Sequence, residues 1–185
     1  MESIHGRFLA DAAPDLAELN RITINYVELE DRIRLAGELS HGGVLNVWAT
    51  RRLLDRLLPV LVTHLEKSVA KGACADSLRS NALQSFAQHA ARELSEEQAP
   101  VRASAASAQW LAQSVNVSFA SGDVCLSFHG DETQCVKLTL EEGKLRQLLN
   151  ILYEVYRQAD WSTDAWPKWV RSAEVPRAGY GARVH

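Results

Sequence analysis

Residues 44–65 have the sequence VLNVWATRRLLDRLLPVLVTHL, and the hydrophobic period changes within this stretch. The order of apolar and polar residues over 44–49 is typical of a β-strand. The leucines from Leu53 to Leu65 instead follow the spacing of one face of an α-helix. Thr50 stands between the two patterns and is a suitable N-cap for the helix. The stretch therefore predicts a strand that leads directly into an amphipathic helix.

Two further strands are predicted before this one. Residues 22–29 are rich in β-branched and aromatic side chains, and residues 32–39 alternate between apolar and polar positions. Glu30-Asp31 separates these strands, and Ser40-His41-Gly42-Gly43 is a turn signal before the third. Residues 20–68 are thus interpreted as one strand-strand-strand-helix unit.

The same order of elements returns 91 residues later. Residues 135–156, CVKLTLEEGKLRQLLNILYEVY, repeat the strand and the helix, and residues 114–120 and 123–128 supply two strands before them. At this offset apolar positions coincide without a gap: Ile24 with Val115, Ile33 with Val124, Leu35 with Leu126, Leu45 with Val136, Leu54 with Leu145 and Leu61 with Leu152. We interpret residues 111–158 as the second unit of an internal duplication. The alternative is that any two such strand-strand-strand-helix stretches resemble each other.

The predicted fold class is α+β, with the duplicated units forming antiparallel sheets and the helices packed on one face. Residues 1–185 are expected to form a single globular domain. A linking helix is predicted at 76–98, with an amphipathic face made of Leu78, Ala82, Leu83, Phe86, Ala87, Ala90 and Leu94. Small residues over 99–110 predict a connector. Residues 159–185 form a Trp-rich C-terminal tail.

The two units differ in their predicted outer faces. The inner positions of the second unit, Phe119 among them, are expected to be core, and its outer positions are small and polar, as suits a face in water. The outer face of the first unit is apolar and edged by arginine, which usually marks a partner or an intramolecular cover. The helix at 78–94 or the Trp-rich tail is the expected cover. The candidate interface comprises Val27, Leu29, Arg32, Arg34, Val44, Trp48, Trp161, Trp166 and Trp169.

The three tryptophans of the tail allow two readings. They either dock on the protein's own sheet or helices, or they form an anchor that inserts into a partner, because such large apolar surfaces are unfavourable in water.

No catalytic, cofactor or metal motif is present in the sequence. The six histidines lack metal-ligand spacing, and neither a phosphate loop nor a nucleophile elbow occurs. Glu141-Glu142 opens the second predicted helix, where negative charge stabilises the helix dipole. No catalytic residue, cofactor or metal is therefore expected.

Two cysteines flank the last predicted turn. The hairpin register should place Cys125 opposite Lys137 or Thr139, and Cys135 opposite Ser127 or His129. The two sulfur atoms would then lie too far apart for a disulfide, and free thiols are expected.

Composition limits the compartment and the partners. The formal net charge of −3 and the pI of about 6.1 do not favour an overall positive electrostatic potential that would attract nucleic acid. The chain has no apolar run long enough for a membrane helix and no secretory signal pattern at its start. An odd count of three cysteines argues against a disulfide framework. A cytoplasmic protein without membrane association is expected.

Repeated units of antiparallel strands followed by a helix resemble, in topology, the Whirly and purine-rich-element-binding folds, which bind single-stranded nucleic acid. The same order resembles the head domains of the end-joining and centriolar scaffold superfamily, which dimerise. The leading hypothesis is a non-enzymatic protein-interaction or assembly protein, with a protein partner, self-association or both. The first alternative is single-stranded nucleic-acid binding, with Trp48 as a stacking platform and Arg32, Arg34, Arg51 and Arg52 on phosphate. The further alternative is an enzyme with an unrecognised site.

Overall fold

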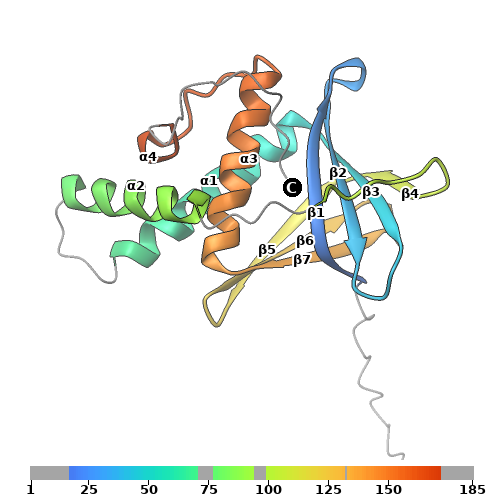
Figure 1. Cartoon of the computed structure of the whole chain (residues 1–185), viewed down its shortest axis with the longest axis horizontal. Helices are drawn as coiled ribbons and strands as arrows, with labels where there is room; N and C mark the ends of the chain where they lie inside the picture. The colour runs from blue at the N-terminus through green and yellow to red at the C-terminus, as the bar shows by residue number, and fades with distance from the viewer. Residues whose placement is uncertain (1–16, 71–76, 94–98, 132, 172–185) are drawn as a thin grey trace, which may run out of the picture.

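The computed structural model describes residues 17–70, 77–93, 99–131 and 133–171 (Figure 1). Its elements in chain order are β1 (Ala17–Val27), a 3₁₀ turn (Glu28–Glu30), β2 (Arg32–Leu39), β3 (Val44–Ala49), α1 (Arg51–Ala70), α2 (Ser77–Glu93), β4 (Ala108–Leu111), β5 (Ser114–Ala120), β6 (Asp123–His129), β7 (Cys135–Leu140), α3 (Glu142–Gln158) and α4 (Lys168–Arg171). The predicted α+β class is confirmed. Within the described residues, the helices are too short or too polar to cross a membrane.

Local sequence signals explain several boundaries. The Thr50 hydroxyl accepts a hydrogen bond from the Leu53 N–H at 3.2 Å, so the predicted N-cap of α1 is confirmed. Ser121 and Gly122, which join β5 to β6, have φ angles of 55° and 95°. Two consecutive positive φ angles in a two-residue loop are those of a type I′ hairpin, whose twist matches that of the flanking strands.

The strands form one seven-stranded mixed sheet in the order β4-β3-β2-β1-β7-β6-β5. The prediction of antiparallel sheets holds for the pairings within each half only, because two parallel pairings join the halves into one mixed sheet. Ala17–Leu19 of β1 run parallel to β7, and Ala108–Leu111 run parallel to β3. These segments lie at the margin of the predicted strands, inside or next to regions expected to be irregular, and their partners are remote in the sequence.

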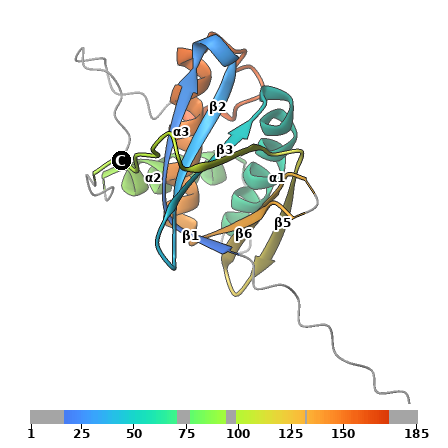
Figure 2. The same cartoon turned by 90° about the vertical axis from the view of Figure 1, so that its right-hand side faces the viewer.

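Two stretches of chain change partner along their length, and this curls the sheet. Leu19 is opposite both Leu39 of β2 and Leu138 of β7. At the end of β4, the Ala112 N–H donates to the Trp48 carbonyl, whereas the next N–H, of Gln113, donates to His129 of β6, both at 2.8 Å. The chain from β4 to β5 therefore bridges the two ends of the strand order, and the sheet wraps round beside α1 and α3 (Figures 1 and 2).

The two halves share many positions at an offset of 91 residues. The β2–β3 pair Arg34 and Trp48 corresponds to the β6–β7 pair Cys125 and Thr139. The parallel pair Ala17 and Val136 corresponds to Ala108 and Leu45. The halves also differ, since Ile24 is opposite Leu35, whereas Val115 is opposite Phe128, two residues beyond the position that the offset gives.

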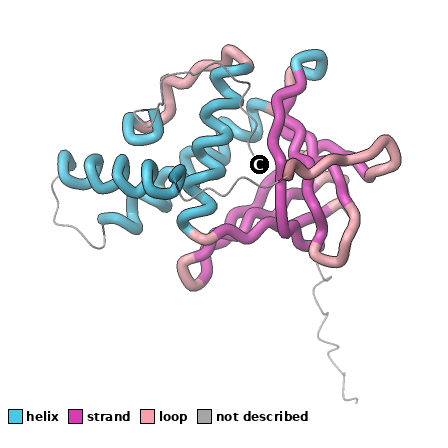
Figure 3. Tube along the Cα trace, in the orientation of Figure 1, coloured by secondary structure: helices cyan, strands magenta, loops and turns pink. Residues whose placement is uncertain are grey.

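One hydrophobic cluster joins the strands, α1, α3 and the chain after α3. Figure 3 shows the helices gathered beside the curled sheet. The leucines that the helical spacing singled out are buried: Leu54, Leu57, Leu58, Leu61 and Leu65 in α1, and Leu145, Leu148, Leu149 and Leu152 in α3. The hydrophobic period thus predicted the core of both helices.

The predicted apolar face of α2 does not face the core. Leu83 and Phe86 are 41% and 75% exposed, whereas Gln84 and Gln88 are buried. Gln84 donates to the Leu65 carbonyl of α1 at 2.7 Å, and Gln88 donates to the Arg146 carbonyl of α3 at 2.9 Å. The described part of α2 is therefore fixed by side-chain amides, a signal that hydrophobic periodicity does not contain.

Truncating Leu19 tests the point where β1 changes partner. Leu19 is 3% exposed, and Leu19→Ala should lower the free energy of unfolding by about 2–5 kcal/mol, because a cavity replaces the contacts that join the halves. Leu29→Ala is the matched control at a position 99% exposed and should change it by less than about 0.5 kcal/mol. Chemical denaturation measures both. Equal effects would contradict the assigned packing.

Candidate functional site

The three tail tryptophans of the candidate interface lie inside the protein. Trp161, Trp166 and Trp169 are 7%, 4% and 2% exposed. The rings of Trp161 and Trp166 meet that of Tyr156 of α3 edge to face, with centroids 5.0 and 5.3 Å apart. Of the two readings of the tail, the structure corresponds to internal docking. Its last residues, 172–185, lie outside the described residues.

Polar contacts orient two of these rings. The Trp161 indole N–H donates to an Asp31 carboxylate oxygen at 3.2 Å, and that of Trp169 donates to Glu66 at 3.3 Å. The guanidinium of Arg146, itself 2% exposed, lies 5.7 Å from the Trp169 ring centroid and donates to Glu142 at 2.8 Å. Trp161 therefore ties α3 to the β1–β2 end of the sheet, whereas Trp169 contacts side chains of α1 and α3.

The remaining candidate residues are spread along β1, β2 and β3. Leu29 is fully exposed beyond the end of β1, and Val27 is paired with Arg32. Val44 lies at the opposite end of β3 from Trp48. They do not form one compact surface.

Trp48 is half-buried in the middle of this region. It pairs with Arg34 of β2, and its indole N–H donates to Gln109 of β4 at 3.4 Å. Strand β4, which the sequence placed in a connector, therefore covers one side of Trp48.

A segment of the predicted connector covers the outer face of the first unit. Thr23, Ala36 and Asn46, all on that face, are buried. The Val101 N–H donates to the Thr23 hydroxyl at 2.9 Å, and Val101 is itself buried. Figure 2 shows the described residues of this connector, from residue 99 onward, passing in front of the sheet that holds β1, β2 and β3. The cover is thus this connector, not the helix or the tail that the sequence suggested.

The thiols of the second unit lie as the sequence predicted. Cys125 is opposite Thr139 and Cys135 is opposite His129, and both cysteines are free. The Cys135 sulfur lies 3.9 Å from His129 Nε2, but burial raises the pKa of this thiol. A raised pKa keeps the proton on sulfur, which is the reverse of what a nucleophilic cysteine needs.

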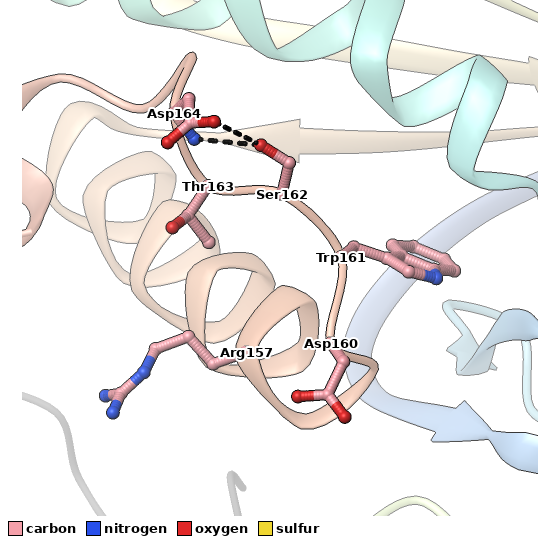
Figure 4. A pocket seen from close by; sticks show the side chains of 6 residues that line it. All are labelled: Arg157, Asp160, Trp161, Ser162, Thr163 and Asp164. Carbon is pink, nitrogen blue, oxygen red and sulfur yellow. Dashed lines mark hydrogen bonds between the residues drawn. The ribbon is translucent and has the colours of Figure 1, made fainter.

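A polar hollow of about 610 Å³ lies beyond the end of α3 (Figure 4). Asp160 has a φ of 52°, and the Ser162 hydroxyl donates to the Asp164 carboxylate at 2.9 Å and accepts from its N–H at 3.3 Å. In the figure, Trp161 points away from Arg157 and Asp160. These contacts fix the conformation of the loop after α3, from which the buried tryptophans reach the core. Across the described residues, no three His, Cys, Asp or Glu side chains gather as a metal site.

A groove of about 300 Å³ lies between α1 and the loop 162–167. Its wall includes Leu58 and Trp166, and its floor includes Tyr156, whose hydroxyl donates to Asp55 at 2.8 Å. The pKa of Tyr156 is raised, mainly by burial and to a smaller extent by this hydrogen bond to Asp55. The tyrosine therefore stays neutral and ties α3 to α1.

A second groove, of about 450 Å³, lies on the other side of α1, against the end of β5. Phe119 and Val60 are 46% and 42% exposed. The His64 ring is stacked on the Phe119 ring, with the two ring centroids 4.2 Å apart. The expectation that Phe119 belongs to the core was wrong, because α1 covers only one side of its ring. The groove is lined by Pro59, Val60, Thr63, His64, Lys67 and Phe119.

Strand β5 borders this groove with an unpaired edge. Within the described residues it pairs with β6 alone and ends the strand order (Figure 2). Ala120 and Asp123 flank the two-residue turn and therefore form a hydrogen-bonded pair, in which each N–H donates to the other residue's C=O. From this pair on, non-hydrogen-bonded and hydrogen-bonded pairs alternate along β5 and β6. The N–H and C=O groups of Val115, Val117 and Phe119 consequently point away from β6.

This edge lacks the devices that protect exposed strands. Residues 114–120, SVNVSFA, contain neither charge nor proline. Natural edge strands usually carry such residues because a bare edge recruits other strands. The unpaired edge of β5 and the α1–β5 groove beside it are together the candidate site, which we call the β5 edge site.

Three comparisons, with protein families, curated proteins and solved structures, found no match for this chain.

Replacing Tyr156 tests its role through the pH dependence of stability. The folded state holds the Tyr156 proton at pH values where the unfolded chain releases it, so its contribution is complete below about pH 10 and is lost as the pH rises further. In Tyr156→Phe, the free energy of unfolding should fall less steeply above pH 10 than in the wild type. Other tyrosines and lysines titrate in both proteins, and the difference between the curves isolates Tyr156. Parallel curves would contradict the raised pKa.

Proposed function

We propose that this chain is a non-enzymatic protein-interaction module that binds an extended protein segment at the β5 edge site. The observation that carries the proposal is the long, uncharged and unpaired edge of β5 beside an apolar groove. A strand added to such an edge gains backbone hydrogen bonds, and its alternate side chains enter neighbouring pockets.

The groove supplies what the backbone edge lacks, which is selectivity. An added strand would satisfy the outward backbone groups of Val115, Val117 and Phe119. Every second side chain of that strand would face the α1–β5 groove. There Val60 of α1 and Phe119 of β5 offer apolar contact. The ligand we expect is therefore an uncharged segment with apolar residues at alternate positions.

We also propose that the two units descend from one duplicated strand-strand-strand-helix unit. Support comes from the shared pairing of β2–β3 with β6–β7 and from the two matching parallel pairings. The units differ where function would act. Near the end of β1, Tyr26 packs against the buried Trp161, whereas Phe119, near the end of β5, packs against His64 and stays half-exposed.

Single-stranded nucleic-acid binding is the second candidate, favoured by the pairing of Trp48 with Arg34. Two contacts weigh against it. Gln109 engages the Trp48 indole, and Arg51 lies 3.4 Å from Asp55 in an ion pair. Both reduce what these side chains could offer to a stacked base or a phosphate.

The strand-binding function can be tested with a phage-displayed library of random peptides selected on the full chain. Val117→Pro removes an outward donor without touching the ladder to β6, so the fold should persist. Selected peptides should bind Val117→Pro at least about tenfold more weakly, equivalent to about 1.4 kcal/mol. Val60→Asp, at an exposed wall of the groove, should have the same effect.

Asn116→Pro is the matched control for the strand assignment. The Asn116 N–H belongs to a hydrogen-bonded pair with Ser127, so this proline should lower the melting temperature whereas Val117→Pro should not. A library that yields no binder, or peptides that bind both Val117→Pro and Val60→Asp as tightly as the wild type, would overturn the proposal.

A further inference from the structure

We propose that the strand bound at the β5 edge site is β5 of a second copy of this chain, antiparallel to the first about a twofold axis at Val117. This inference rests on the proposed function and names its partner. The outward residues Val115, Val117 and Phe119 are symmetric about Val117. A twofold axis there pairs Val117 with its own copy and Val115 with Phe119 of the other copy, so every outward donor and acceptor of β5 finds a partner.

The side chains of β5 suit this self-pairing. On the outer face, Asn116 would stand opposite Ser118 of the second copy, and both are small, polar and exposed. On the inner face, Val115 would stand opposite Phe119, a β-branched and aromatic pair of the kind that stabilises sheets. Because residues 114–120 carry no charge, two identical strands meet without like-charge repulsion.

The geometry also limits the assembly to two copies. A twofold contact uses the same strand of each protomer, and β5 is then paired on both sides. At the opposite end of the strand order, β4 is only four residues long and continues directly into β5. A closed dimer is therefore expected in place of an open chain of subunits.

Mass in solution gives the first test. The wild-type mass should double with rising concentration, and the dissociation constant of Val117→Pro should be at least about tenfold higher. Ser118→Lys supplies a second variant, whose side chain lies on the exposed outer face. It brings two positive charges close to the axis and should also weaken the dimer, more strongly at low salt.

Disulfide trapping tests the register. Cys74, Cys125 and Cys135 are first changed to Ser, because Ser118 is opposite Cys125 and a new thiol there could pair within the chain. A mixture of Asn116→Cys and Ser118→Cys proteins, with tags of different size, should then form a disulfide-linked heterodimer. The paired residues are expected about 4.5 Å apart between Cα atoms, within reach of a disulfide. Each variant alone should form much less of the covalent dimer.

The outcomes separate this inference from the proposed function. If the wild type stays monomeric while selected peptides still lose affinity for Val117→Pro, the edge binds strands but the second copy is the wrong occupant. If the chain dimerises and Val117→Pro dimerises equally well, the dimer uses another surface and this inference is overturned. Trapping of Asn116→Cys alone would contradict the axis at Val117 and move it to Asn116.

Discussion

The pairing of each half's first strand with the last strand of the other half is the constraint on which the rest of the structure depends. Backbone N–H and C=O groups must be paired wherever the chain is buried. Ala17–Leu19 satisfy theirs on β7, and Ala108–Leu111 satisfy theirs on β3, so neither half completes a sheet alone. The curl that results brings α1 beside β5 and α3 beside β1. It also leaves the seven residues of β5 without a second strand beside them among the residues that the structure describes.

Internal covers show how the chain treats its other exposed surfaces. The outer face of the first unit is closed by the connector through Val101 and Thr23, and the end of β1 is closed by Trp161. Buried glutamines fix α2 on α1 and α3. A bare strand edge is an aggregation hazard unless it has a partner. Among the described residues, the β5 edge has no such internal cover, and this difference supports a binding role for it.

The sequence predicted the elements much better than their assembly. Periodicity located the strands other than β4 and the buried leucines of both helices, because these depend on local spacing. Residue type located the N-cap Thr50. It missed the parallel pairings, since the short segments at Ala17 and Ala108 acquire strand structure only from remote partners. It also reversed α2, where Gln84 and Gln88 face inward for hydrogen bonds that no hydrophobic pattern encodes.

The candidate site was harder to predict for a related reason. Trp48 and the tail tryptophans stand out in a sequence because of their size, yet large aromatic side chains are at least as useful to a core as to an interface. Phe119 looked like core because alternation tells only the face of the sheet, not how far α1 extends over it. The unpaired edge has no residue signal except an absence, the lack of charge and proline over 114–120. That absence gains meaning only once the strand order shows that nothing else in the described chain pairs with β5 on that side.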